Sequence, residues 1–146
     1  MEGRSLNNWN DFLNLSEIDQ CKFLLNVAKL AWKDRDEYPE IKLKVSDYLS
    51  VASEILKGEV IKLPQLMVFL EDPDMEDSFA EYFDIISENE KVAAALDLAS
   101  YACGYICRIV AQNQGIKSLP EPVIESIPEI YDYYQERAAY LHIIDT

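Results

Sequence analysis

The chain has 146 residues, and 49% of them are hydrophobic, which is enough to bury the core of one domain without disulfides or metals. Its 27 acidic and 13 basic residues give a net charge of −14 at pH 7, so the chain as a whole repels nucleic acid and anionic lipid and attracts basic surfaces. The hydrophobic content excludes a disordered acidic tail, and the presence of only four glycines and six prolines argues against a many-turned β-sandwich.

The first predicted helix begins near Ser16. Ser16 and Asp19 have the spacing of a capping box, in which side chains satisfy free N–H groups of the first helical turn. Apolar residues then recur at spacings of three and four, which places them on one helical face. This face consists of Ile18, Cys21, Leu25, Ala28 and Trp32.

The second predicted helix runs from about Pro39 to Lys57, because proline suits a first turn and Gly58 suits the residue just past the end. Its apolar face consists of Ile41, Val45, Tyr48, Leu49, Ala52, Ile55 and Leu56. The next stretch, 59–72, opens with β-branched residues that are compatible with a short strand. Pro64 and the apolar run that follows it favour a short helix instead.

A third stretch predicts a helix around Met75–Ile86, with its acidic residues largely on one side. The apolar stripe of this helix consists of Phe79, Tyr82, Phe83 and Ile86. We interpret Phe79 and Phe83 as core residues. Ser87 and Glu90 then have the spacing of a second capping box.

The longest predicted helix spans about 88–113 and ends at Gly115. Its core stripe consists of Val92, Ala95, Leu96, Ala99, Cys103, Ile106 and Val110. Residues 92–111 are also the best candidate for a membrane span. Asp97 and Arg108 would each cost a few kcal/mol in lipid, roughly, so we predict a buried core helix.

The end of the chain predicts an extended linker and one more helix. Pro120 and Pro122 favour extended backbone over 117–123, and Ser126 with Pro128 begins a helix that runs to about Leu141. No stretch clearly predicts a strand. We therefore expect one all-α domain over residues 1–146, a compact bundle of about five to seven helices around a central helix rich in small residues.

The charge is unevenly distributed along the chain. Residues 1–62 hold eleven acidic and nine basic residues, whereas residues 63–146 hold sixteen acidic and four basic ones. Residues 71–90 hold nine acidic residues and no basic one. We therefore expect the second part of the chain to carry a binding surface and the first part to serve mainly as scaffold.

Few residues are candidates for catalysis or metal binding. The only histidine, His142, lies in a stretch typical of a fraying helix end, which speaks against a catalytic pair. Cys103 and Cys107 are four residues apart and could ligate a metal with Cys21 and His142. The simpler interpretation is that the three cysteines are small buried hydrophobic side chains. Because the cysteines are few and odd in number, they favour a reducing cytoplasm as the compartment.

Recognised motifs for ligands are missing from the sequence. It has no glycine-rich phosphate-binding loop, and the acidic run 72–77 lacks the central glycine and closing glutamate of a calcium loop. No apolar stretch typical of a signal peptide opens the sequence. We therefore predict no enzyme, no cofactor, no metal, and no direct contact with nucleic acid or membrane.

Carboxylates mixed with tyrosines are the one pattern that indicates function. Acidic side chains steer and orient a basic partner, and tyrosines are typical interface anchors. Tyr131, Tyr133 and Tyr134 span most of a helical turn, so at least one of them should be exposed. The predicted partner-binding residues are Asp72, Asp74, Glu76, Asp77, Glu81, Asp84, Glu88, Glu129, Tyr131, Asp132, Tyr134 and Glu136.

The sequence AAALDLASYACGYICRIVA and the following LPEPVIESIPEIYDYYQE carry a resemblance to a known family. In size, acidity and helix pattern the chain resembles the small all-helical immunity proteins of bacterial polymorphic-toxin and contact-dependent growth inhibition systems. The resemblance implies a cytoplasmic protein that neutralises a cognate cationic toxin, an RNase or DNase domain, by covering its active site or substrate path. A nucleic-acid mimic or regulatory adaptor that binds a cationic host protein is the alternative.

Overall fold

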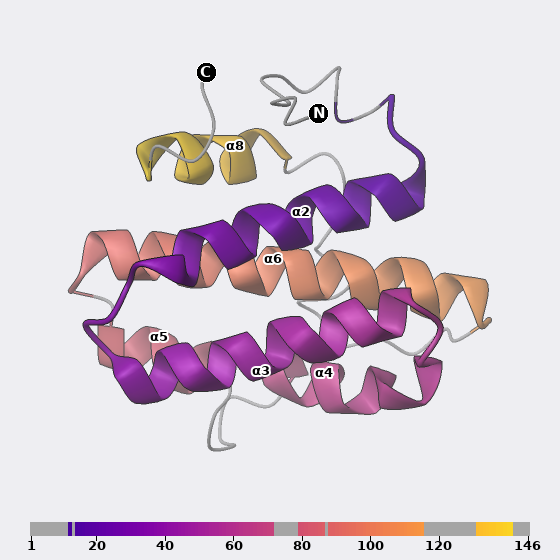
Figure 1. Cartoon of the computed structure of the whole chain (residues 1–146), viewed down its shortest axis with the longest axis horizontal. Coiled ribbons are helices and arrows are strands. Elements are labelled where there is room, and N and C mark those ends of the chain that lie inside the picture. Colours follow the sequence, from indigo (N-terminus) through magenta and orange to yellow (C-terminus); the bar gives the residue numbers. More distant parts are fainter. Residues whose placement is uncertain (1–11, 13, 72–78, 87, 116–130, 142–146) are drawn as a thin grey trace.

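The computed structural model describes residues 12, 14–71, 79–86, 88–115 and 131–141 (Figure 1). Within these ranges the regular elements are all helical, and no strand occurs. They are α2 (Glu17–Lys33), α3 (Pro39–Leu56), a 3-10 turn (Val60–Lys62), α4 (Leu63–Glu71), α5 (Phe79–Ile86), α6 (Glu90–Asn113) and α8 (Tyr131–Tyr140). The predicted all-α bundle is confirmed.

Helix α6 forms the centre of this bundle. It packs against α2, α3, α4, α5 and α8, and Figure 1 shows it running through the middle of the molecule. Its alanines and Gly104 let these neighbours approach closely, and side chains on all sides of the helix are buried. It is also the one helix in the described ranges that is long and apolar enough to cross a membrane, and 78% of its apolar stretch is buried inside the protein.

Helices α2 and α3 follow the predicted boundaries closely. The Asp19 N–H donates to Ser16 Oγ at 3.2 Å, which is the predicted cap of α2. Gly58 follows α3 with φ of 115°, a left-handed conformation that favours glycine. Of the predicted apolar face, Ile18 is 40% exposed, because α2 also buries Gln20 and Leu24 and Ile18 therefore lies at the edge of the buried face.

The middle of the chain is helical, as favoured, but one core assignment is wrong. The β-branched opening of this stretch forms the 3-10 turn Val60–Lys62, and α4 follows it, so the alternative of a strand is wrong. In α5, Tyr82 and Ile86 are buried, four residues apart on the side that packs on α6. Phe83 points to a different side and is 38% exposed, so it is not the core residue we predicted.

The start of α6 also differs from the prediction. The cap is Asn89, whose side-chain oxygen accepts a hydrogen bond from the Val92 N–H at 3.2 Å, so Glu90 is the first residue of the helix rather than a partner of Ser87 in a capping box. At the other end, Gly115 has φ of 75° just after the helix, as predicted. The predicted linker 117–123 and the predicted helix start at 126–130 lie outside the described residues.

Buried polar bonds connect α2 to α6 and α8. The Trp32 indole N–H donates to the Ala95 carbonyl at 2.9 Å, and the Tyr134 hydroxyl donates to the Leu24 carbonyl at 2.7 Å. The Tyr105 hydroxyl donates to Gln20, the one buried polar residue among those described. These bonds satisfy polar atoms that would otherwise be costly inside an apolar core.

Candidate protein-binding surface

Part of the predicted binding surface lies outside the described residues. This holds for Asp72, Asp74, Glu76, Asp77 and Glu129. Tyr131 and Asp132 begin α8, but the description covers only their helical backbone. These seven residues therefore remain predictions.

Four predicted acidic residues can be placed. Asp84, Glu88 and Glu136 are exposed, and Glu81 is half-buried. Asp84 lies in α5, Glu88 lies between α5 and α6, and Glu136 lies in α8. Helices α5 and α8 both pack on α6. These carboxylates thus come from separate segments that pack on the same helix, α6.

A shallow, open hollow of about 450 Å³ lies between the start of α6 and the end of α8. It is lined by Tyr38, Glu88, Asn89, Glu90, Lys91 and Tyr140, and we call it the acidic pocket. Tyr140 is 41% exposed, and its hydroxyl donates to Glu90 Oε2 at 3.4 Å. The pocket joins the loop before α3, the start of α6 and the end of α8, so residues distant in sequence form it together.

The carboxylates of the acidic pocket have a local structural role as well. Glu90 occupies the first turn of α6, where the partial positive charge of the helix N-terminus stabilises a carboxylate. Lys91 adds one positive charge beside Glu88 and Glu90. The carboxylates of Glu88 and Glu90 and the rings of Tyr38 and Tyr140 therefore surround one hollow. Carboxylates beside aromatic rings are the kind of group that can pair with a lysine or arginine side chain.

The prediction of Tyr134 as an interface anchor is wrong. Its side chain is 2% exposed, and its hydroxyl bonds to the backbone of α2. Its ring packs on that of Tyr101, with centroids 5.2 Å apart. Tyr134 falls on the side of α8 that faces α6, together with Ala138, so it stabilises the core.

Sequence reasoning missed Tyr38, Tyr140 and Glu90. Tyr140 lies four residues after Glu136 and therefore on the same face of α8, a spacing that is visible in the sequence. Tyr38 carried no such signal. It belongs to the nearly neutral first part of the chain, and only the fold brings it beside the start of α6.

The cysteines contribute to the core. Cys21, Cys103 and Cys107 are free and buried. Burial raises the pKa of the Cys107 thiol to about 12, and burial together with the Glu17 carboxylate raises the pKa of Cys21 to about 12. Burial also raises the pKa of Cys103 well above its ordinary value. Protonated thiols are poor nucleophiles and poor metal ligands.

Metal-ligand candidates do not gather in the described ranges, where no group of three or more histidine, cysteine or acidic side chains lies close enough to share an ion. His142 and the acidic run 72–77 fall outside these ranges.

Comparisons of the chain with protein-family models, with curated proteins and with solved structures found no match.

Proposed function

We propose that this chain is a cytoplasmic immunity protein that binds a cationic toxin domain of the nuclease class and blocks it. The observation that carries the proposal is the acidic pocket, in which Glu88 and Glu90 lie beside Tyr38 and Tyr140. Exposed carboxylates also occur on α5, at Asp84, and on α8, at Glu136.

The charge distribution supports rapid docking. Sixteen acidic and four basic residues lie in positions 63–146, and the field of such a region draws in a basic partner. Association could reach about 10⁸ M⁻¹s⁻¹ at low salt and should slow as salt is raised. The tyrosine rings and the exposed Phe83 then offer desolvated contact area that slows release.

The sign of the surface also suggests how inhibition would work. A nuclease needs basic residues where the phosphate backbone of its substrate binds. An acidic surface is attracted most strongly to that same place. A lysine or arginine from the toxin would enter the acidic pocket, pairing with Glu88 or Glu90 and lying against a tyrosine ring. The substrate path would then be covered.

Co-expression with the cognate toxin tests the proposal. Cells that make the toxin should grow when this chain is present, and the two proteins should co-purify at low salt and separate at high salt. Replacing both Glu88 and Glu90 by glutamine should weaken the complex about tenfold, because the cation of the toxin then loses both carboxylates with which it could pair.

The control is Glu59→Gln, which removes one exposed carboxylate from the first part of the chain and should leave affinity nearly unchanged. Continued growth arrest without a detectable complex would refute the immunity role. Capture of a chromosomal DNA-binding protein that free DNA displaces would favour the mimic or adaptor alternative.

A further inference from the structure

A second surface of the protein has the opposite charge. Helices α2 and α3 lie side by side, and two hollows of about 230 Å³ and 520 Å³ follow the boundary between them. Five lysines line these hollows, and we call the combined surface the lysine groove. They are Lys22, Lys29, Lys33, Lys42 and Lys57. No acidic residue lines either hollow, although the chain carries 27 of them.

Helical spacing explains why the lysines gather. Lys22, Lys29 and Lys33 are seven and four residues apart, so they project from one face of α2. Lys29 lines both hollows and joins them into one surface. Lys22 and Lys33 are eleven residues apart, which is about 16 Å at the helical rise.

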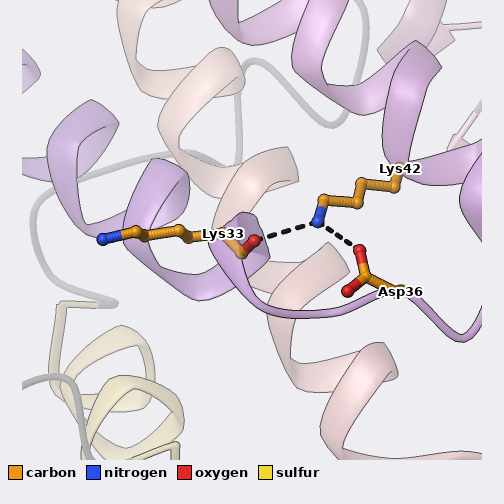
Figure 2. Close-up of polar contacts among 3 residues, drawn as sticks. All are labelled: Lys33, Asp36 and Lys42. Carbon is orange, nitrogen blue, oxygen red and sulfur yellow. Dashed lines mark hydrogen bonds and ion pairs between the residues drawn. The ribbon is translucent and has the colours of Figure 1, made fainter.

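One lysine is already engaged. Lys42 Nζ donates to the Lys33 carbonyl at 2.9 Å and to Asp36 Oδ1 at 2.6 Å, which holds the turn between α2 and α3 (Figure 2). Figure 2 also shows the Lys33 side chain extending away from Lys42. Within the described ranges, the ammonium groups of Lys22, Lys29, Lys33 and Lys57 form no ion pair.

The groove also has apolar surface. Its floor is formed by Leu25, Trp32, Leu49 and Leu56. Leu30 and Leu43 are 47% and 65% exposed. Neither leucine lines a hollow. Leu30 lies three residues before Lys33, and Leu43 lies three residues before Ser46 of the groove lining, so each is about one helical turn from a lining residue of its own helix.

We propose that the lysine groove binds an acidic, amphipathic helical segment of a partner protein. Carboxylates of such a segment would pair with Lys22, Lys29, Lys33 and Lys57, and its apolar side chains would cover Leu30 and Leu43. A row of lysines about 16 Å long matches a helix of about eleven residues and exceeds what a single phosphate or carboxylate group can engage. The proposal does not depend on toxin binding, because it uses a different face and the opposite charge.

Single-stranded nucleic acid fits the groove less well. Such ligands are usually held by aromatic side chains that stack on bases, often helped by arginine. The cations of the groove are all lysine, and its one aromatic residue, Trp32, is 2% exposed. Leucines exposed beside the groove also reward a partner with apolar side chains, which a polyphosphate lacks.

The test uses a fluorescein-labelled helical peptide of about fifteen residues, with glutamates on one face and leucines on the other. Binding is measured by fluorescence anisotropy at low salt. We expect Lys29→Glu to weaken binding of this peptide about tenfold, because Lys29 lines both hollows. The matched control is Lys91→Glu, which changes the net charge equally at the acidic pocket and should leave the affinity within about twofold.

Further arms separate the alternatives. Lys29→Arg should retain binding, and the same peptide with glutamine in place of glutamate should lose it. Equal binding of both peptides, or equal weakening by Lys91→Glu, would overturn the proposal. So would tighter binding of an oligothymidylate than of the peptide, or concentration-dependent self-association that Lys29→Glu abolishes. The last result would identify a second copy of this chain as the occupant.

Discussion

The acidic pocket and the lysine groove rest on the same central helix and carry opposite charge. The pocket lies at the start of α6 and the end of α8, and the groove follows α2 and α3. A charge sum over a stretch of sequence conceals this difference. Residues 1–62 are nearly neutral in total, yet five of their nine basic residues line one groove. Distribution over the faces of helices therefore decides what a surface attracts.

The comparison also corrects our expectation of which part of the chain carries a binding surface. We expected the first part of the chain to serve mainly as scaffold. Tyr38 from that part lines the acidic pocket, and α2 and α3 form a charged surface of their own. Both parts of the chain therefore carry candidate binding surface.

The largest expected effect comes from a substitution that damages both surfaces. Trp32 forms part of the floor of the lysine groove and bonds to Ala95 of α6, one to two turns from the acidic pocket. Trp32→Ala should lower the free energy of unfolding by about 3–5 kcal/mol, because it leaves a cavity and removes a buried hydrogen bond. Urea denaturation followed by circular dichroism measures this loss. Leu30→Ala, at an exposed position, is the control and should change stability by at most about 0.5 kcal/mol.

A smaller effect should separate a tyrosine of the core from a tyrosine of the acidic pocket. Tyr134→Phe removes the buried bond to Leu24 and should cost about 1 kcal/mol of stability. Tyr140→Phe removes only an exposed 3.4 Å bond to Glu90 and should leave stability nearly unchanged. Thermal denaturation of the two variants measures both values. Equal destabilisation would contradict the assignment of Tyr140 to the surface.

The last effect concerns helix α6, which lies between the two surfaces, and it is absent at neutral pH. The pKa of Cys107 is raised from 9.0 to about 12 in the folded protein. The unfolded thiol therefore loses its proton first as pH rises, so stability is constant below about pH 9 and falls between about pH 9 and about 12. Cys107→Ala should reduce the slope of that fall in urea titrations at several pH values. An identical slope in both proteins would show that the thiol is accessible to solvent when folded.

Much of the fold follows from local signals in the sequence. The cap at Ser16, the proline at the start of α3 and the glycines after α3 and α6 each act within a few residues, so spacing alone identified them. The core prediction for Phe83 failed, and Ile18 lies at the edge of its face, because burial depends on which neighbouring helix covers a face. An apolar stripe indicates that a face exists but does not give its width.

The candidate sites were harder to predict for the same reason. Tyr38 and Glu90 meet through packing between distant elements, and helical period alone does not reveal that meeting. Tyr134 looked like an interface anchor because tyrosines cluster around it, but only tertiary contacts decide which side of α8 faces α6. The lysines of α2 were visible at spacings of seven and four. Their common face became significant only beside α3.

Burial of α6 on all sides has a consequence for hydrogen exchange. A helix that contacts five others cannot open alone, because exposing its amides requires separating most of the core. Amide protons between Ala94 and Val110 should therefore exchange only through global unfolding, whereas those of α5 can exchange through local opening. A ligand bound at either the acidic pocket or the lysine groove should slow exchange in this same helix. The amides of α6 thus report on the occupancy of two surfaces that share no residue.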